Sequence, residues 1–160
     1  MKLVLKNKTL PDVSINELSA GTVFRFFKNK TLEQSINDDE LYIKLQSSDR
    51  GFRCAQLSGD CAVVKRYGPF AGYEVNCKIK AYNLKESKKE RLPLGVMDYG
   101  STVMLYLGDN SLEDDIYMIG NDPIEKKLIT LVSLETGEVR TVSDDVLCVK
   151  ILSSLIIKEK

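Results

Sequence analysis

Paired carboxylates are the first residues of this sequence whose type could do chemistry. The pairs Asp38-Asp39, Asp114-Asp115 and Asp144-Asp145 each stand in a polar turn beside an expected strand. Such pairs can bind divalent cations or act in glycoside hydrolysis, and they are also common as solvated turn residues. Because two of the pairs recur at matching places in the two halves of the chain, we interpret them as turns.

The cysteines are expected to be reduced and buried rather than metal ligands. Cys54, Cys61, Cys77 and Cys148 stand singly in apolar segments, and none forms a C-x-x-C pair. Zinc needs about four closely spaced thiolates or imidazoles, and the sequence has no histidine. The lack of histidine also excludes Ser-His and Cys-His nucleophile pairs, and no glycine-rich phosphate loop is present. We therefore expect a non-enzymatic protein without a metal ion or a cofactor.

Residues 63–80 offer another chemistry, the binding of nucleic acid. An apolar strand start runs into the basic pair Lys65-Arg66, and a glycine-rich turn and a second, partly cationic strand follow. Tyr67, Phe70 and Tyr73 flank this turn among the cations. Aromatic rings can stack on bases while neighbouring cations neutralise phosphates. The structural alternative is a hairpin in which Phe70 fills the interior of its own barrel.

The elements that must position these residues are short strands. Residues 22–27, 41–45 and 52–57 are rich in β-branched and aromatic residues and are bounded by turn residues, which predicts strands. Residues 11–18 are turn-rich and allow one short helical turn. No apolar run is long enough to span a membrane, and residues 1–6 have too short an apolar core for a signal peptide. We therefore expect a cytoplasmic protein without membrane contact.

The second half of the chain repeats the outline of the first. Four segments recur in the same order: residues 100–106 match 21–26, residues 114–119 match 38–43, residues 134–138 match 57–60, and residues 147–151 match 75–79. Four anchors in one order indicate two copies of a small β unit. Each copy has about five short strands, which suits a small closed barrel, SH3-like or OB-like, because closure removes exposed edges.

The predicted fold is therefore all-β with few helical turns, built as two tandem small barrels. We place a basic SH3-like barrel at residues 1–83, a charged linker at 84–93 and a second, acidic barrel at 94–160. Residues 1–92 carry 17 basic and 11 acidic residues, a net charge of +6, whereas residues 93–160 carry 6 and 12, a net charge of −6. This asymmetry favours an anion-binding face in the first half. The alternative is two solvated surfaces of opposite sign that attract each other.

Residues 63–80 resemble the KOW motif of NusG-type elongation factors and several ribosomal proteins. The resemblance lies in Val63, Val64, residues 68–71, Tyr73 and the following strand through Lys80, with Val75 where the family usually has glycine. It implies an SH3-like barrel that binds nucleic acid or RNA polymerase. A KOW-like barrel followed by a second small barrel is also similar to the MotB-type DNA-binding proteins of T-even-like phages. That similarity implies non-specific DNA binding and an effect on host or early viral transcription.

We predict a sequence-independent DNA-binding protein, a viral accessory factor that acts on the host nucleoid or on transcription. Double-stranded DNA is the expected partner, with RNA as a second choice. One alternative is a protein-interaction module that modulates a host enzyme or polymerase through its acidic second half. Another is a barrel that sequesters a nucleotide. The predicted nucleic-acid-binding residues are Arg25, Lys28, Lys30, Lys65, Arg66, Tyr67, Phe70, Tyr73, Lys78, Lys80, Lys88, Lys89 and Arg91.

Overall fold

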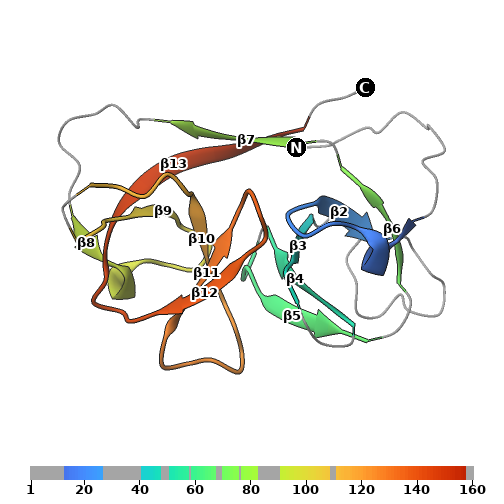
Figure 1. Cartoon of the computed structure of the whole chain (residues 1–160), viewed down its shortest axis with the longest axis horizontal. Helices are drawn as coiled ribbons and strands as arrows, with labels where there is room; N and C mark the ends of the chain where they lie inside the picture. The colour runs from blue at the N-terminus through green and yellow to red at the C-terminus, as the bar shows by residue number, and fades with distance from the viewer. Residues whose placement is uncertain are drawn as a thin grey trace.

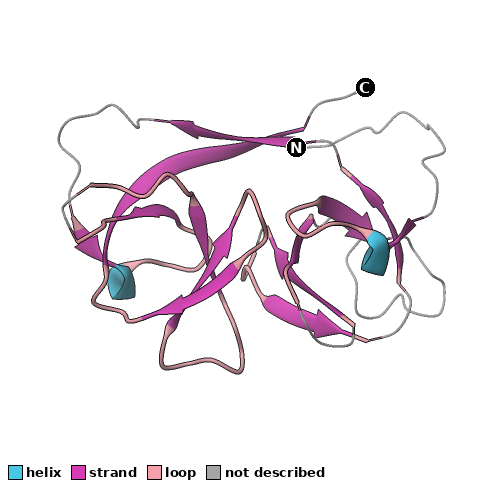
Figure 2. Ribbon diagram, viewed as in Figure 1, coloured by secondary structure: helices cyan, strands magenta, loops and turns pink. Residues whose placement is uncertain are grey.

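The computed structural model describes residues 13–26, 41–47, 51–57, 59–67, 70–75, 77–82, 91–108 and 111–157. Their regular structure is β-strand apart from two 3-10 helices, η1 (Ile15–Glu17) and η2 (Leu94–Val96) (Figure 2). The predicted all-β class is confirmed, and η1 is the helical turn expected within residues 11–18. None of the helices in these ranges is long and apolar enough to cross a membrane.

The strands form two antiparallel sheets that lie side by side (Figure 1). The first sheet contains, in order of hydrogen-bonded neighbours, β1 (Val13–Ser14), β6 (Ala71–Glu74), β2 (Val23–Phe26), β3 (Tyr42–Leu45), β4 (Phe52–Gln56) and β5 (Val63–Arg66). The second contains β12 (Val139–Val142), β11 (Ile129–Ser133), β10 (Tyr117–Gly120), β9 (Thr102–Leu105), β13 (Leu147–Ile157) and β7 (Cys77–Tyr82), and β8 (Leu92–Pro93) also pairs with β13.

Both sheets follow one strand order. The order β1-β6-β2-β3-β4-β5 of the first is matched by β8-β13-β9-β10-β11-β12 in the second, and β7 is the additional strand. The 3-10 helices occupy equivalent places: the Ile15 N–H donates to the Phe70 carbonyl at 3.0 Å, and the Leu94 N–H donates to the Val146 carbonyl at 2.9 Å. The structure thus uses one arrangement twice. The match of residues 100–106 with 21–26 is confirmed, whereas β13, which contains residues 147–151, corresponds to β6 and not to residues 75–79.

Each sheet is curled. The connection from β5 to β6 covers only residues 67–70, although β4, β3 and β2 lie between these strands in the sheet. On a flat sheet the two strands would be about 19 Å apart, whereas the five steps from Arg66 to Ala71 span at most about 18 Å. The sheet must therefore bend its two ends toward each other. The pairings among the described residues nevertheless leave both sheets open, so they do not establish the closed barrels that we predicted.

The two curled sheets enclose different side chains. The interior of the first is an aromatic cluster, and that of the second is mainly aliphatic. Where the second sheet has the buried Ile119, the first has the buried Lys44, whose Nζ donates to the carbonyls of Ile15, Asn16 and Leu18 at the end of η1. The aromatic cluster consists of Ile15, Phe24, Phe26, Tyr42, Phe52 and Cys54, with Phe70 packed against it; the second interior consists of Leu94, Val103, Leu105, Tyr117, Ile119, Leu131 and Cys148.

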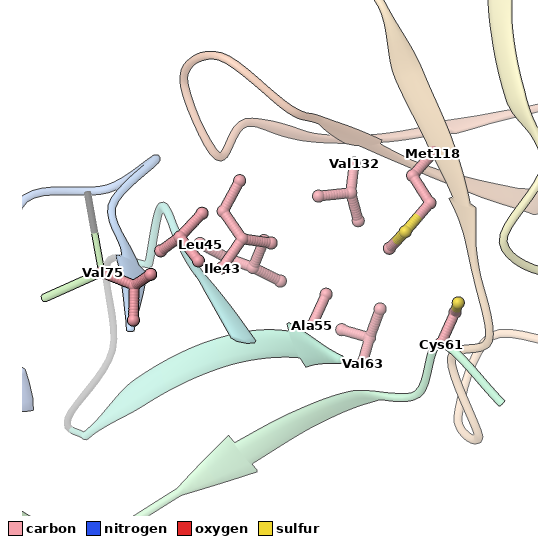
Figure 3. Close-up of a cluster of buried hydrophobic side chains, with 9 residues drawn as sticks. Ile43, Leu45, Ala55, Cys61, Val63, Val75, Met118 and Val132 are labelled. Atoms are coloured by element: carbon pink, nitrogen blue, oxygen red, sulfur yellow. The ribbon is translucent and has the colours of Figure 1, made fainter. Parts of the chain in front are cut away.

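A third cluster joins the two sheets, and we call it the shared core. Met118 and Val132 of the second sheet pack among buried residues of the first (Figure 3). These partners are Val23, Ile43, Leu45, Ala55, Cys61, Val63 and Val75. The sheets therefore bury apolar surface against each other, which is the main favourable term in folding.

An approximate two-fold axis relates the two sheets, so each hydrogen bond described here between them occurs twice, at equivalent residues. The residue after β3, Gln46, donates its N–H to the carbonyl of Gly137, two residues before β12, at 2.9 Å. Equivalently, the residue after β10, Asn121, donates to the carbonyl of Cys61, two residues before β5, at 2.9 Å. Gly137 and Cys61 both have positive φ, 71° and 50°. Each unit therefore presents the same surface to the other, as in an isologous dimer.

The pairing of β7 crosses the boundary that we expected at residue 83. Residues 77–82 pair with β13 of the second sheet, from Cys77 opposite Ile157 to Tyr82 opposite Leu152. In Figure 1, β7 and β13 form an extension that reaches from the second sheet toward the first. Leu92 and Pro93, at the end of the expected linker, form β8; residues 83–90 lie outside the described residues. The expected division at residue 83 thus does not coincide with a division between sheets.

Candidate nucleic-acid interface

The hairpin of β4 and β5 brings two cationic side chains together. Arg53 stands opposite Lys65 in the register, and Phe52 stands opposite Arg66. Residues directly opposite on antiparallel strands share a face, with Cβ atoms about 5 Å apart. Because Phe52 faces the aromatic cluster, Arg53 and Lys65 lie on the other face of the hairpin. The predicted residue Lys65 therefore has Arg53, which is not among the predicted contact residues, as a neighbour.

An exposed tyrosine completes this surface. Tyr67 follows β5 directly, and 67% of its surface is exposed. The Nζ of Lys65 lies 5.3 Å from the centre of the Tyr67 ring, within the range of a cation–π contact. Gly51 allows this arrangement, because a Cβ there would lie 2.2 Å from the Arg66 carbonyl oxygen and 3.4 Å from the Tyr67 ring, and its φ is +84°. We call Arg53, Lys65 and Tyr67 the cationic face.

Arg66 points toward the aromatic cluster and is half-buried. Among the described residues its Nε is buried without a hydrogen-bond partner. Burial raises the pKa of the neighbouring Cys54 thiol to about 12, and the charge of Arg66 acts against that rise. Arg66 therefore sits at the border between the cluster and the surface, with its charge only partly available to a ligand.

Two predicted contact residues have other surroundings. Arg25 is 7% exposed on β2, so its guanidinium is not an accessible cation of the surface. Phe70 packs against Phe26 and Phe52, with ring centres 5.8 and 5.9 Å apart. The structural alternative for Phe70, a ring that fills the interior of its own unit, is confirmed. Of the aromatic residues that we predicted to stack on bases, Tyr67 is exposed and Phe70 is not.

The other predicted contacts lie outside the cationic face or outside the described residues. Arg91 is exposed, and its guanidinium lies 4.7 Å from the centre of the Tyr106 ring in the second unit. Tyr73 lies on β6, while Lys78 and Lys80 lie on β7 and so belong to the second sheet by their pairing. Lys28, Lys30, Lys88 and Lys89 lie outside the described residues.

A second segment, which the sequence pattern does not single out, lies beside the cationic face. The loop of residues 121–128, between β10 and β11, begins with Asn121, whose carbonyl accepts the Val63 N–H at 2.9 Å. The next residue, Asp122, forms an ion pair with Arg53 at 3.5 Å. Figure 1 shows this loop projecting from the second unit on the side where β5 lies. The signal in the sequence was a run of mixed character, Pro123-Ile124-Glu125-Lys126-Lys127, in which an apolar residue stands among charges.

The surface of the second unit contains an acidic hollow of about 600 Å³. Arg140 lies within it and donates to Glu113 at 3.0 Å and to the Tyr117 hydroxyl at 3.1 Å. Burial raises the pKa of Tyr117, and the hydrogen bond to Tyr117 raises the pKa of Arg140, so both groups keep their protons at neutral pH. The hollow is lined by Leu107, Leu112, Glu113, Asp114, Asp115, Tyr117, Glu138 and Arg140. Its carboxylates make it unsuitable for a phosphate group.

No protein-family model, curated protein or solved structure matches the chain. Within the described ranges, no group of three or more histidine, cysteine, aspartate or glutamate side chains is placed to hold a metal ion. The charges and exposed side chains of the surface are therefore the features that bear on function.

Proposed function

We propose that this protein binds double-stranded DNA without sequence preference and without catalysing a reaction. The observation that carries the proposal is the cationic face, where Lys65 lies against the exposed ring of Tyr67 and next to Arg53. Cations neutralise phosphates and release counterions, and an aromatic ring can stack on any base. The ion pair of Arg53 with Asp122 is no obstacle, because a single partly exposed pair contributes only about 0–1 kcal/mol.

The proposal also includes the type of barrel that each unit forms. We infer that each curled sheet acts as a small SH3-like barrel, and that the turn after β5 plays the part of a KOW loop. The short connection between β5 and β6 supports this, because it requires the two ends of the sheet to approach each other. In this role the protein is a viral accessory factor in the cytoplasm of the host, where it would act on the nucleoid or on transcription.

A binding titration on a labelled duplex, repeated at several salt concentrations, tests the function. If about four to six phosphates are neutralised, the slope of log K against log[salt] is about −4 to −5. Single-stranded DNA and duplex RNA of the same length show whether the duplex form of DNA is preferred. No binding at low salt, or binding that does not respond to salt, would contradict the proposal.

A pair of charge reversals locates the interface. Lys65→Glu should weaken binding about tenfold or more and reduce the magnitude of the salt slope by at least about 1, because it removes one phosphate contact. Lys150→Glu reverses an exposed lysine on β13 of the second sheet and serves as the matched control. Equal losses in the two variants would show that the binding surface is not the cationic face.

A second candidate function, the binding of a basic partner protein, is favoured by the acidic hollow of the second unit. Glu138 and Asp114 line it, and Asp114 is exposed. The variant Asp114→Lys with Glu138→Lys should abolish such a complex in a pull-down from host lysate and leave the DNA titration unchanged. A wild-type protein that retains its partner at low salt but gives no DNA shift would favour this function over the first.

A further inference from the structure

The loop between β10 and β11 exposes an apolar side chain that the fold does not use. Ile124 is 92% exposed, whereas burying an isoleucine would stabilise the fold by about 1.5–3 kcal/mol. Its counterpart between β3 and β4 covers residues 46–51, so the loop of residues 121–128 is two residues longer. An added segment that presents isoleucine to solvent is a feature of the surface rather than of the core.

The loop is held in shape by its own carboxylates. The Ile124 N–H donates to Asp122 Oδ1 at 3.0 Å, and the N–H groups of Lys127 and Leu128 donate to Glu125 Oε1 at 3.0 and 3.1 Å. Asp122 also pairs with Arg53 of the first unit through its other oxygen, at 3.5 Å. Ile124 is therefore presented by a preorganised loop, so less conformational entropy is lost on binding.

The charges around Ile124 favour a polyanion. Lys126 and Lys127 are exposed on the loop, whereas the carboxylates of Asp122 and Glu125 are already engaged with Arg53 and with backbone N–H groups. The base of the loop is joined to the start of β5 through Asn121, which places the loop next to the cationic face. One surface thus combines cations from both units with the protruding side chain of Ile124.

We propose that Ile124 is a wedge that enters the minor groove of duplex DNA between two base pairs and kinks it, while Lys126 and Lys127 contact the adjacent phosphates. This inference rests on the proposed function. Apolar side chains such as isoleucine and proline, flanked by cations, kink DNA by about 20–90° in this way. A membrane fits the loop less well, because one isoleucine buries too little apolar surface for stable anchoring.

Energy transfer between dyes at the two ends of a duplex of about 30 base pairs tests the wedge. Wild-type protein should bring the ends closer on binding. Ile124→Ala should bind with a similar salt slope and up to about tenfold lower affinity, and should leave the duplex straight. Val96→Ala is the matched control, since Val96 is 63% exposed on η2 of the same unit, and it should bend DNA like the wild type.

The outcomes separate this inference from the function on which it rests. If the wild type binds duplex but does not bend it, or if Ile124→Ala bends it equally, the wedge is overturned and DNA binding stands. If the wild type binds no DNA at low salt, both are overturned. Sedimentation with vesicles of phosphatidylserine and phosphatidylcholine that depends on Ile124 would assign the loop to a membrane and overturn the wedge. Equal urea midpoints of Ile124→Ala and wild type show that the loop variant is folded.

Discussion

Replacing Gly137 by alanine should weaken the contact between the two units, because no side chain fits at this position. A Cβ on Gly137 would lie 2.3 Å from the Lys44 carbonyl oxygen and 2.6 Å from the Gly21 nitrogen, both backbone atoms of the first unit. The φ of Gly137 is +71°, in the left-handed region that favours glycine. Either the loop must change its conformation or the units must move apart.

The cost follows from three contributions. A residue with a Cβ in left-handed conformation costs about 1–2 kcal/mol, and overpacking against a rigid neighbour costs about 1–3 kcal/mol. Moving the loop also weakens the hydrogen bond from Gln46 to Gly137, which contributes about 0.5–1.5 kcal/mol. Alanine also reduces the conformational entropy of the unfolded chain, which offsets the loss of stability by somewhat less than 1 kcal/mol. We expect a loss of about 4 kcal/mol in the free energy of unfolding.

Urea unfolding followed by circular dichroism measures this loss, with two glycines as references. Among the described residues, no atom lies within 4 Å of the position of a Cβ on Gly108, so Gly108→Ala should change stability by less than about 0.5 kcal/mol. At Gly100, φ is +86° and a Cβ would lie 2.9 Å from the Cys61 Sγ, a side-chain atom, so the loss should be intermediate. If Gly137→Ala came within 1 kcal/mol of Gly108→Ala, the close packing of the units described above would be refuted.

Two further predictions concern buried polar groups. Lys44→Met should lower the melting temperature by roughly 5–10 °C, because three carbonyls at the end of η1 lose a charged donor; Ile119→Met at the equivalent position is the control in a calorimetric scan, and equal shifts would contradict this reasoning. Burial raises the pKa of the Cys54 thiol from 9.0 to about 12, so the folded state keeps this proton where the unfolded chain loses it. The resulting stabilisation is complete below pH 9 and falls by about 1.4 kcal/mol per pH unit between roughly pH 10 and 11. Unfolding titrations at these pH values should show a shallower decline for Cys54→Ala, and parallel declines would show that the thiol is not buried.

Much of the strand pattern was predictable from the sequence because it depends on local preferences. The aromatic and β-branched residues at 22–27, 41–45 and 52–57 lie in β2, β3 and β4, with ends shifted by a residue or two. The matching of residues 21–26 with 100–106 also holds in space, since Gly21 and Gly100 each stand two residues before a strand with φ near +87°. A backbone with this φ favours glycine at both positions, so the match was visible in the sequence.

The partners of the strands were not predictable in the same way. The alternation of residues 75–80 predicts a strand but does not say which sheet it joins, and β7 joins the second. Likewise, Val63 and Ile43 were expected to be apolar strand residues, but nothing local shows that Met118 and Val132 of the other unit cover them.

The surface was predicted only in part, for a related reason. Charge identifies Lys65, but burial depends on neighbours distant in the sequence, and Arg25 proves to be buried while Arg53 joins the interface. Ile124 escaped notice because a single apolar residue in a polar loop gives no periodic signal. The exposed fraction of Ile124 and the position of its loop, both of which come from the structure, are what suggest a role for it.

The approximate two-fold contact has an evolutionary consequence. Two copies of one unit that meet through the same surface have the arrangement of a homodimer whose protomers are joined in one chain. In a homodimer every mutation appears in both protomers, so a substitution that helps at one copy of a site must be tolerated at the other. Fusion removes that constraint. One unit can therefore have Lys44 and an aromatic interior while the other has Ile119 and a longer loop around Ile124, and Cys61 can stand where the other unit has Gly137.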